Sequence, residues 1–175
     1  MGAAACANTQ PNGAVRTGTK MGTGSDLDAA VLAACNIGAS GLVQRLQLAF
    51  SCEELINMDT FSKSDPFCIL FRQTGNMWQK IGQTEVINDN LNPQWVTKIT
   101  VDFHFEQQER FKVQVFDCDD DKNLQNLAAH DFIGELEFTL HEIVTTINQQ
   151  MTKPLHNVKH ARPGRIKIHA EEMAA

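Results

Sequence analysis

Closely spaced cysteines are absent from this sequence. Its five cysteines stand far apart and form no CxxC pair, which argues against a zinc site and against a disulfide framework. Basic residues are also too few to dominate, since the formal net charge is −6. A nucleic-acid binder needs a basic face, and constitutive adsorption to anionic lipid needs cationic side chains near the surface. We therefore expect no nucleic-acid partner.

Long apolar stretches and catalytic motifs are missing as well. The chain has no run of about 18 apolar residues and no apolar signal-peptide core, so we expect a cytoplasmic protein. It contains no phosphate-binding glycine loop, no HExxH and no evident Ser-His-Asp arrangement. We expect a protein that is not an enzyme and has no small-molecule substrate.

Aromatic residues are absent from the first part of the chain. Residues 1–41 hold seven of the eleven glycines and none of the aromatic residues, of which Phe50 is the first. Such a segment cannot bury enough apolar surface to offset the entropy of ordering, so it is predicted to be a flexible tail with at most one short helix. Its start, Met1-Gly2-Ala3-Ala4-Ala5-Cys6, partly matches a myristoylation signal. Gly2 and Cys6 are therefore candidate lipidation sites, and an ordinary N-terminus of small residues is the alternative.

From residue 42 onward the sequence has the alternation typical of β-strands. Apolar residues recur at every second position in 43–50 and 95–101, and turn residues separate seven or eight such segments. The further strands are expected at 67–71, 78–86, 111–116, 132–138 and 165–169, with a short helix within 140–150. This pattern predicts an all-β fold, an antiparallel β-sandwich spanning residues 42–173.

Two loops of this predicted sandwich are strongly acidic. Asp59 and Asp65 bracket the first, and the second runs from Asp117-Cys118-Asp119-Asp120-Asp121 to Asp131. A charge run of this kind is most often simply solvated, but carboxylates from two loops at one end would suit the six to eight oxygen ligands of Ca²⁺. An EF-hand is excluded because Lys122 stands where such a loop requires glycine.

These residues resemble a known family in combination. Asp59, Ser64-Asp65-Pro66-Phe67, Asn92-Pro93-Gln94-Trp95, Val115-Phe116-Asp117-Cys118-Asp119 and His130-Asp131-Phe132-Ile133-Gly134 resemble a C2 domain. Met151-Thr152-Lys153-Pro154-Leu155, among other segments, is similar to the first C2 domain of a copine. Copines continue into a second C2 domain and a von Willebrand A-like domain, so the chain is expected to be a fragment or a truncated relative.

The resemblance implies an eight-stranded Greek-key sandwich, with the permuted, type II strand order favoured. It implies one or two Ca²⁺ ions, or more, held by the acidic loops. The implied ligands are the side chains of Asp59, Asp65, Asp117, Asp119 and Asp131 and the backbone carbonyls of Met58 and Cys118. Asp131 is the least secure of these ligands, because an insertion at residues 122–129 precedes it, and Asp121 is its substitute.

The expected function follows from this site. The acidic loops would bind an anionic phospholipid membrane when calcium is present, with Phe61, Lys63 and Lys122 as membrane contacts and with Phe61 alternatively packed over its own loop. We expect recruitment from the cytoplasm to the plasma membrane or other membranes, on behalf of a larger signalling or trafficking protein. The alternative is a calcium-independent protein–protein interaction sandwich that binds partners along a strand edge.

Overall fold

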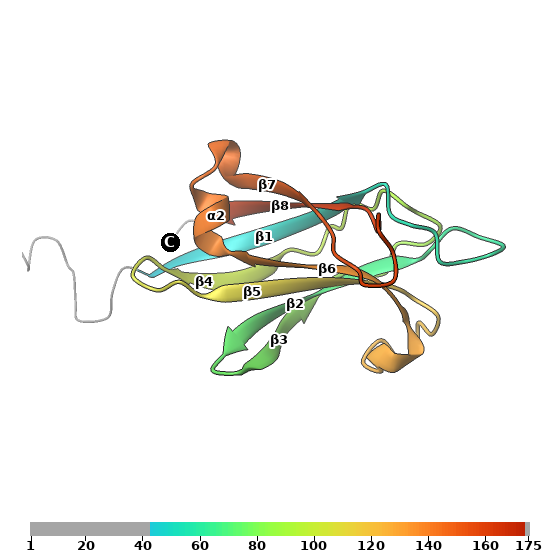
Figure 1. Ribbon diagram of the computed structural model, residues 1–175. Coiled ribbons are helices and arrows are strands. Elements are labelled where there is room, and N and C mark those ends of the chain that lie inside the picture. The colour runs from blue at the N-terminus through green and yellow to red at the C-terminus, as the bar shows by residue number, and fades with distance from the viewer. Residues whose placement is uncertain (1–42, 174–175) are drawn as a thin grey trace, which may run out of the picture. The chain divides into compact units, whose positions relative to one another are not determined.

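Residues 43–173 form a sandwich of two four-stranded antiparallel sheets in the computed structural model (Figure 1). One sheet has the strand order β4-β1-β8-β7 and the other the order β3-β2-β5-β6. The last strand lies between β1 and β7, which is the permuted order that the sequence favoured. The strands are β1 (Val43–Glu53), β2 (Pro66–Thr74), β3 (Met77–Gln83), β4 (Ile99–His104), β5 (Arg110–Asp117), β6 (Asp131–Thr139), β7 (Gln150–Pro154) and β8 (Arg165–Glu172).

The main core lies between the two sheets and follows directly from the alternation in the sequence. In β1, Leu46, Leu48, Phe50 and Cys52 are all buried, while the residues between them are more exposed. The inward side chains of β5 and β8 complete the layer from both sheets. Burying such side chains stabilises a fold by about 1.5–3 kcal/mol each.

A second apolar cluster covers the outer face of the sheet β3-β2-β5-β6. Phe67, Ile69 and Phe116 are buried there, on the opposite side of the sheet from the main core. Leu124 and Leu127 of the β5–β6 loop pack against these side chains. The insertion at residues 122–129 therefore folds back over the sheet. Its extra residues cover the outer apolar cluster, which accounts for the length of this loop.

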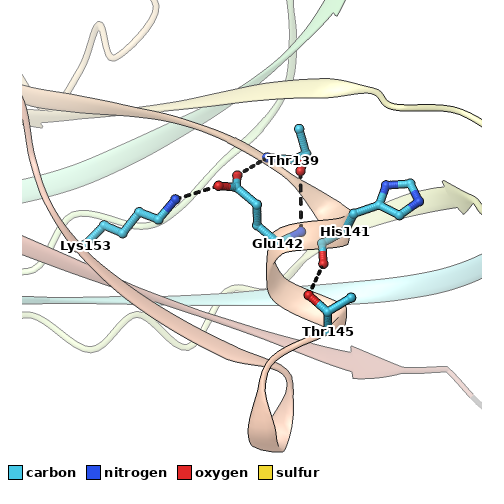
Figure 2. Close-up of polar contacts among 5 residues, drawn as sticks. All are labelled: Thr139, His141, Glu142, Thr145 and Lys153. Atoms are coloured by element: carbon cyan, nitrogen blue, oxygen red, sulfur yellow. Dashed lines mark hydrogen bonds and ion pairs between the residues drawn. The ribbon is translucent and has the colours of Figure 1, made fainter.

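The short helix expected within residues 140–150 is confirmed, and an unpredicted strand follows it. α2 (Leu140–Val144) is capped at its N-terminus by Thr139, whose Oγ1 accepts a hydrogen bond from the backbone N–H of Glu142. The Glu142 carboxylate accepts in return from the Thr139 N–H and from Lys153 Nζ (Figure 2). A 3₁₀ turn with positive φ at Asn148 then ends the helical segment, so that β7 begins at residue 150.

The strand expected at residues 95–101 also begins later than predicted, because β4 starts only at Ile99. The indole of Trp95 is buried and donates a hydrogen bond from Nε1 to the carbonyl of Pro66, at 3.2 Å. The carboxylate of Glu85 accepts hydrogen bonds from the backbone N–H groups of Val96 and Thr97. These contacts hold the segment away from a regular ladder, and no periodicity in the sequence encodes them.

Candidate functional site

Strand register brings the two acidic loops together at one end of the sandwich. Pro66 pairs with Asp117 across β2 and β5, and Asp117 pairs with Asp131 across β5 and β6. Directly opposite residues of antiparallel strands lie on the same face of the sheet. The expectation that the loops after β1 and β5 emerge at the same end is therefore confirmed.

Hydrogen bonds hold one oxygen of each of four carboxylates. Asp117 Oδ1 accepts from the backbone N–H of Asp65 at 2.6 Å, and Asp119 Oδ2 accepts from that of Asp131 at 3.0 Å. Asp65 Oδ1 accepts from the Asp89 N–H at 2.7 Å. Asp59 Oδ2 accepts from the Ser62 hydroxyl at 2.7 Å. These contacts tie the acidic loops to each other and to the β3–β4 loop.

Asp117 is the buried carboxylate of the site. Its residue is 2% exposed, and within residues 43–173 its Oδ2 is the one buried side-chain oxygen or nitrogen without a hydrogen-bond partner. Burial raises the pKa of Asp117, the nearby Ser64 hydroxyl and the Asp65 N–H partly offset this, and the charges of Asp59 and Asp119 raise the pKa further. An anionic oxygen buried without a partner destabilises a fold, and a cation bound to it would remove that cost.

The donor set fits calcium in its chemistry, because every predicted side-chain ligand is a carboxylate. As they stand, however, no three Asp, Glu, His or Cys side chains between residues 43 and 173 lie close enough together to hold a metal ion. Asp119 and Asp131 are exposed, whereas Asp59 and Asp65 are half-buried. Carboxylates without a counter-ion repel one another, so a splayed arrangement is what their charges favour.

Asp120 and Asp121 have different surroundings from the buried carboxylate. Asp120 Oδ1 accepts a hydrogen bond from the backbone N–H of Lys122 at 3.1 Å, which closes a local turn. Asp121 is exposed. The Cys118 thiol between these acidic residues has a pKa raised by burial and by the charges of Asp121, Asp65 and Asp119, so it is a poor nucleophile.

Three residues support the site in roles that the sequence did not predict. Asn57 donates from Nδ2 to the carbonyls of Asp59 and Ser62, and its Oδ1 accepts from the Ser64 N–H. The Ser64 hydroxyl, fully buried, accepts from the Met58 N–H at 2.9 Å. Polar residues in a loop carry no periodic signal, so only the folded geometry identifies them.

His130 is the third supporting residue and fixes the backbone beside Asp119. Its Nδ1 accepts from the Asp119 N–H at 3.2 Å, and its Nε2 faces the Asn123 carbonyl at 3.3 Å. The imidazole packs edge-on against Phe67, with ring centroids 5.3 Å apart. His130 therefore links the acidic stretch, the insertion and the outer apolar cluster.

The expected membrane contacts lie on the outside of the loops. Phe61 is 102% exposed, so it does not pack over its own loop. Lys63 and Lys122 are also exposed. Gly2 and Cys6, with the whole predicted tail, lie outside the described residues. In residues 43–173 no helix is long and apolar enough to cross a membrane.

Comparison with known proteins places the sandwich in a family. The model of the C2 domain matches residues 47–156. Copine-B of Dictyostelium discoideum is 37% identical over 134 residues, which are 74% of this chain and 25% of that protein. Nicotinic receptor-associated protein 1 of Caenorhabditis elegans is 29% identical over 153 residues, 73% of this chain and 24% of that protein. The chain thus spans about a quarter of the length of these curated relatives.

Solved structures show the same fold. A C2 domain of plant extended synaptotagmin 1 superposes with a TM-score of 0.56 at 16% identity, covering 75% of this chain and 97% of that one. The calcium-bound pair of C2 domains of extended synaptotagmin 2 gives a TM-score of 0.52 at 23% identity, covering 74% of this chain and 45% of that one. With its family-model match and its eight-stranded sandwich, the chain belongs to the C2 domain family.

Proposed function

We propose that this C2 domain is a calcium-dependent phospholipid-binding module that brings a larger signalling or trafficking protein to membranes. The observation that carries the proposal is the buried, unpartnered Oδ2 of Asp117 at the point where two acidic loops meet. The similarity to copine-B and the calcium-bound state of one structural neighbour support the same function. Recruitment would be from the cytoplasm to the plasma membrane or other membranes.

The proposed calcium ligands are distributed over both loops. Asp117 would anchor the site through the oxygen that lacks a partner, and Asp59 and Asp65 would join it from the first loop. Asp119 and Asp131 would complete it from the second, with the carbonyls of Met58 and Cys118, and Asp121 as an alternative to Asp131. When bound, calcium supplies positive charge and open coordination positions for the phosphate oxygens of a lipid.

The charge balance explains why calcium would gate the binding. The two loops carry seven Asp residues against Lys63 and Lys122, a net charge of −5. A surface with this charge is repelled by anionic lipid, and two Ca²⁺ ions would bring it close to neutral. Phe61 would then enter the interface, where burying a Phe side chain contributes about 2–3 kcal/mol.

A calcium titration followed by vesicle sedimentation tests the proposal. Calcium should increase binding of the chain to vesicles of phosphatidylcholine and phosphatidylserine, and EGTA should reverse that increase. The Asp117→Asn/Asp119→Asn variant should remain folded and fail to respond to calcium. Vesicle binding that is identical with calcium and with EGTA, in both proteins, would refute it and leave the calcium-independent interaction module as the better interpretation.

A further inference from the structure

The loop between β7 and β8, residues 155–164, lies at the same end of the sandwich as the acidic loops (Figure 1). Arg165 pairs with Glu53 where β1 leads into the first acidic loop, and the Ile56 N–H donates to the Pro163 carbonyl. On the other side, Asn157 Nδ2 donates to the carbonyls of Phe132 and Ile133, just after Asp131. The β7–β8 loop therefore borders both halves of the proposed calcium site.

This loop is rich in cations that no carboxylate neutralises. Residues 143–170 contain no Asp or Glu at all. Along the flanks of the sandwich, by contrast, cations form ion pairs, such as Arg45 with Asp102 and Lys98 with Glu171. Within residues 43–173, seven Lys and Arg side chains pair with carboxylates in this way. The six others are Lys63, Lys80, Lys122, Lys159, Arg162 and Arg165, and all but Lys80 belong to the loop end.

A cavity of about 220 Å³ lies beneath two of these cations. Arg162 and Arg165 line it together with Leu155, Pro163 and the single acidic residue Glu54. Both arginines are exposed, whereas Leu155 and Pro163 are buried and form an apolar floor. Arginine binds phosphate oxygens through two parallel N–H groups, so a pair of arginines above an apolar floor suits a phosphate ester with a hydrocarbon part.

The loop also presents an apolar residue from a fixed backbone. Val158 is 94% exposed. The residue before it, Asn157, is buried and holds the loop to β6, and its Oδ1 accepts from the Lys159 N–H at 2.8 Å. Val158 and Lys159 thus project from an anchored turn, with an apolar and a cationic side chain next to each other. An exposed apolar residue beside a cation is what an anionic lipid surface would accept.

We propose that the β7–β8 loop is a second, calcium-independent binding site for anionic phospholipid. Lys159, Arg162 and Arg165 receive the headgroup phosphate, and Val158 enters the interface beside them. This second site rests on the proposed membrane function of the domain, but it does not require bound calcium. Lys159, Arg162 and Arg165 carry three positive charges against the one carboxylate of Glu54 at the cavity, so the local charge of the site is about +2 whether or not calcium is bound.

Vesicle sedimentation of the full chain in EGTA at low ionic strength tests the site. The test variant is Lys159→Gln/Arg162→Gln. The matched control is Arg45→Gln/Lys98→Gln, which loses the same charge from exposed positions on the flank. Each cation near an anionic surface strengthens binding about fivefold, so the test variant should bind phosphatidylserine-containing vesicles about 25-fold more weakly. The control variant should bind them like the unmodified chain, and vesicles of phosphatidylcholine alone should bind none of the three.

Equal binding by the test and control variants would overturn the proposal. So would displacement from the vesicles by inorganic phosphate where chloride of the same ionic strength has no effect, because the site would then select a soluble anion. The outcome stays separate from that of the calcium site. If calcium changes nothing while the test variant still loses binding in EGTA, the β7–β8 loop is supported and the calcium-dependent function fails.

Discussion

Replacing Asp117 by Asn should have opposite effects on the protein without calcium and with it. Without calcium, Asp117 is a buried carboxylate whose Oδ2 has no partner and whose charge is repelled by Asp59 and Asp119. Asn keeps the oxygen that accepts from the Asp65 N–H and removes the negative charge that Asp59 and Asp119 repel. An unsatisfied buried polar group costs about 1–3 kcal/mol, and more when it is charged, so the neutral variant should unfold at a temperature several degrees higher than the unmodified chain.

With calcium the order should reverse. A ligand present at 100 times its dissociation constant, and bound only by the folded state, stabilises it by about 2.7 kcal/mol. For a folded domain of about 130 residues this raises the melting temperature by about 10 °C. The Asp117→Asn variant should show no such rise, because it lacks the anchoring oxygen.

Differential scanning calorimetry with EGTA and with a calcium series measures both effects. Asp120→Asn is the matched control, since it removes one charge from the same loop at a residue whose Oδ1 only closes a local turn. It should keep the calcium response. If Asp117→Asn is less stable in EGTA and still gains stability from calcium like the unmodified chain, then the unpartnered oxygen is not the anchor of a cation site.

Phe61→Ala should leave the free energy of unfolding within about 0.5 kcal/mol, because the side chain is 102% exposed, and should weaken calcium-dependent vesicle binding about 30- to 150-fold. Phe67→Ala is the contrasting control, since this buried residue should cost about 3–5 kcal/mol of stability in urea unfolding. The pKa of Glu142 is lowered by its hydrogen bonds with Lys153 and with the Thr139 N–H, so its contribution to stability is present above the unfolded pKa and lost as pH falls through the lowered one. Urea unfolding at acidic and neutral pH should show this loss of stability in the unmodified chain but not in Glu142→Ala or Glu142→Gln. The Ala variant should be about 1 kcal/mol less stable than the unmodified chain at neutral pH. The same dependence of stability on pH in all three proteins would contradict the assignment. Gly164→Ala should cost at least about 2 kcal/mol of stability, because φ is +118° and a Cβ would lie 2.9 Å from Leu55 Cα. Gly75→Ala, at φ +60° with open space around it, should cost only about 1 kcal/mol. Similar melting temperatures for the two variants would show that the close contact at Gly164 is relieved at little cost.

Much of the sandwich could be predicted from the sequence because alternation encodes it directly. The run from Leu46 to Cys52 gives β1, its inward face and its place in the core without further information. The strand β7 was missed because its five residues follow a capped helix and alternate too briefly to be distinguished from a helical continuation. The late start of β4 was missed because the hydrogen bonds that the Val96 and Thr97 N–H groups donate to Glu85 join parts of the chain that only the fold brings together.

The candidate site, like the fold, could be predicted only in part from the sequence. The sequence located the acidic residues, and strand register then placed Asp117 between Pro66 and Asp131. The supporting roles of Asn57, Ser64 and His130 depend on side-chain hydrogen bonds across loops, which leave no pattern in the sequence. The position of the basic β7–β8 loop beside the acidic loops depends on the pairing of β8 with β1, which joins the two ends of the domain and is not encoded by alternation.

The insertion at residues 122–129 lowers the conformational entropy that the second acidic loop has to lose when a ligand binds. A connection of this length between β5 and β6 would lose considerable conformational entropy if it had to become ordered when a ligand arrives. Leu124 and Leu127 are already packed on the outer apolar cluster, and His130 is held between Phe67 and Asn123. Most of that entropy is therefore lost during folding, before any ligand binds. By this reasoning, shortening the insertion would leave a smaller loop that is nevertheless less preorganised, with weaker affinity for whatever the acidic residues bind.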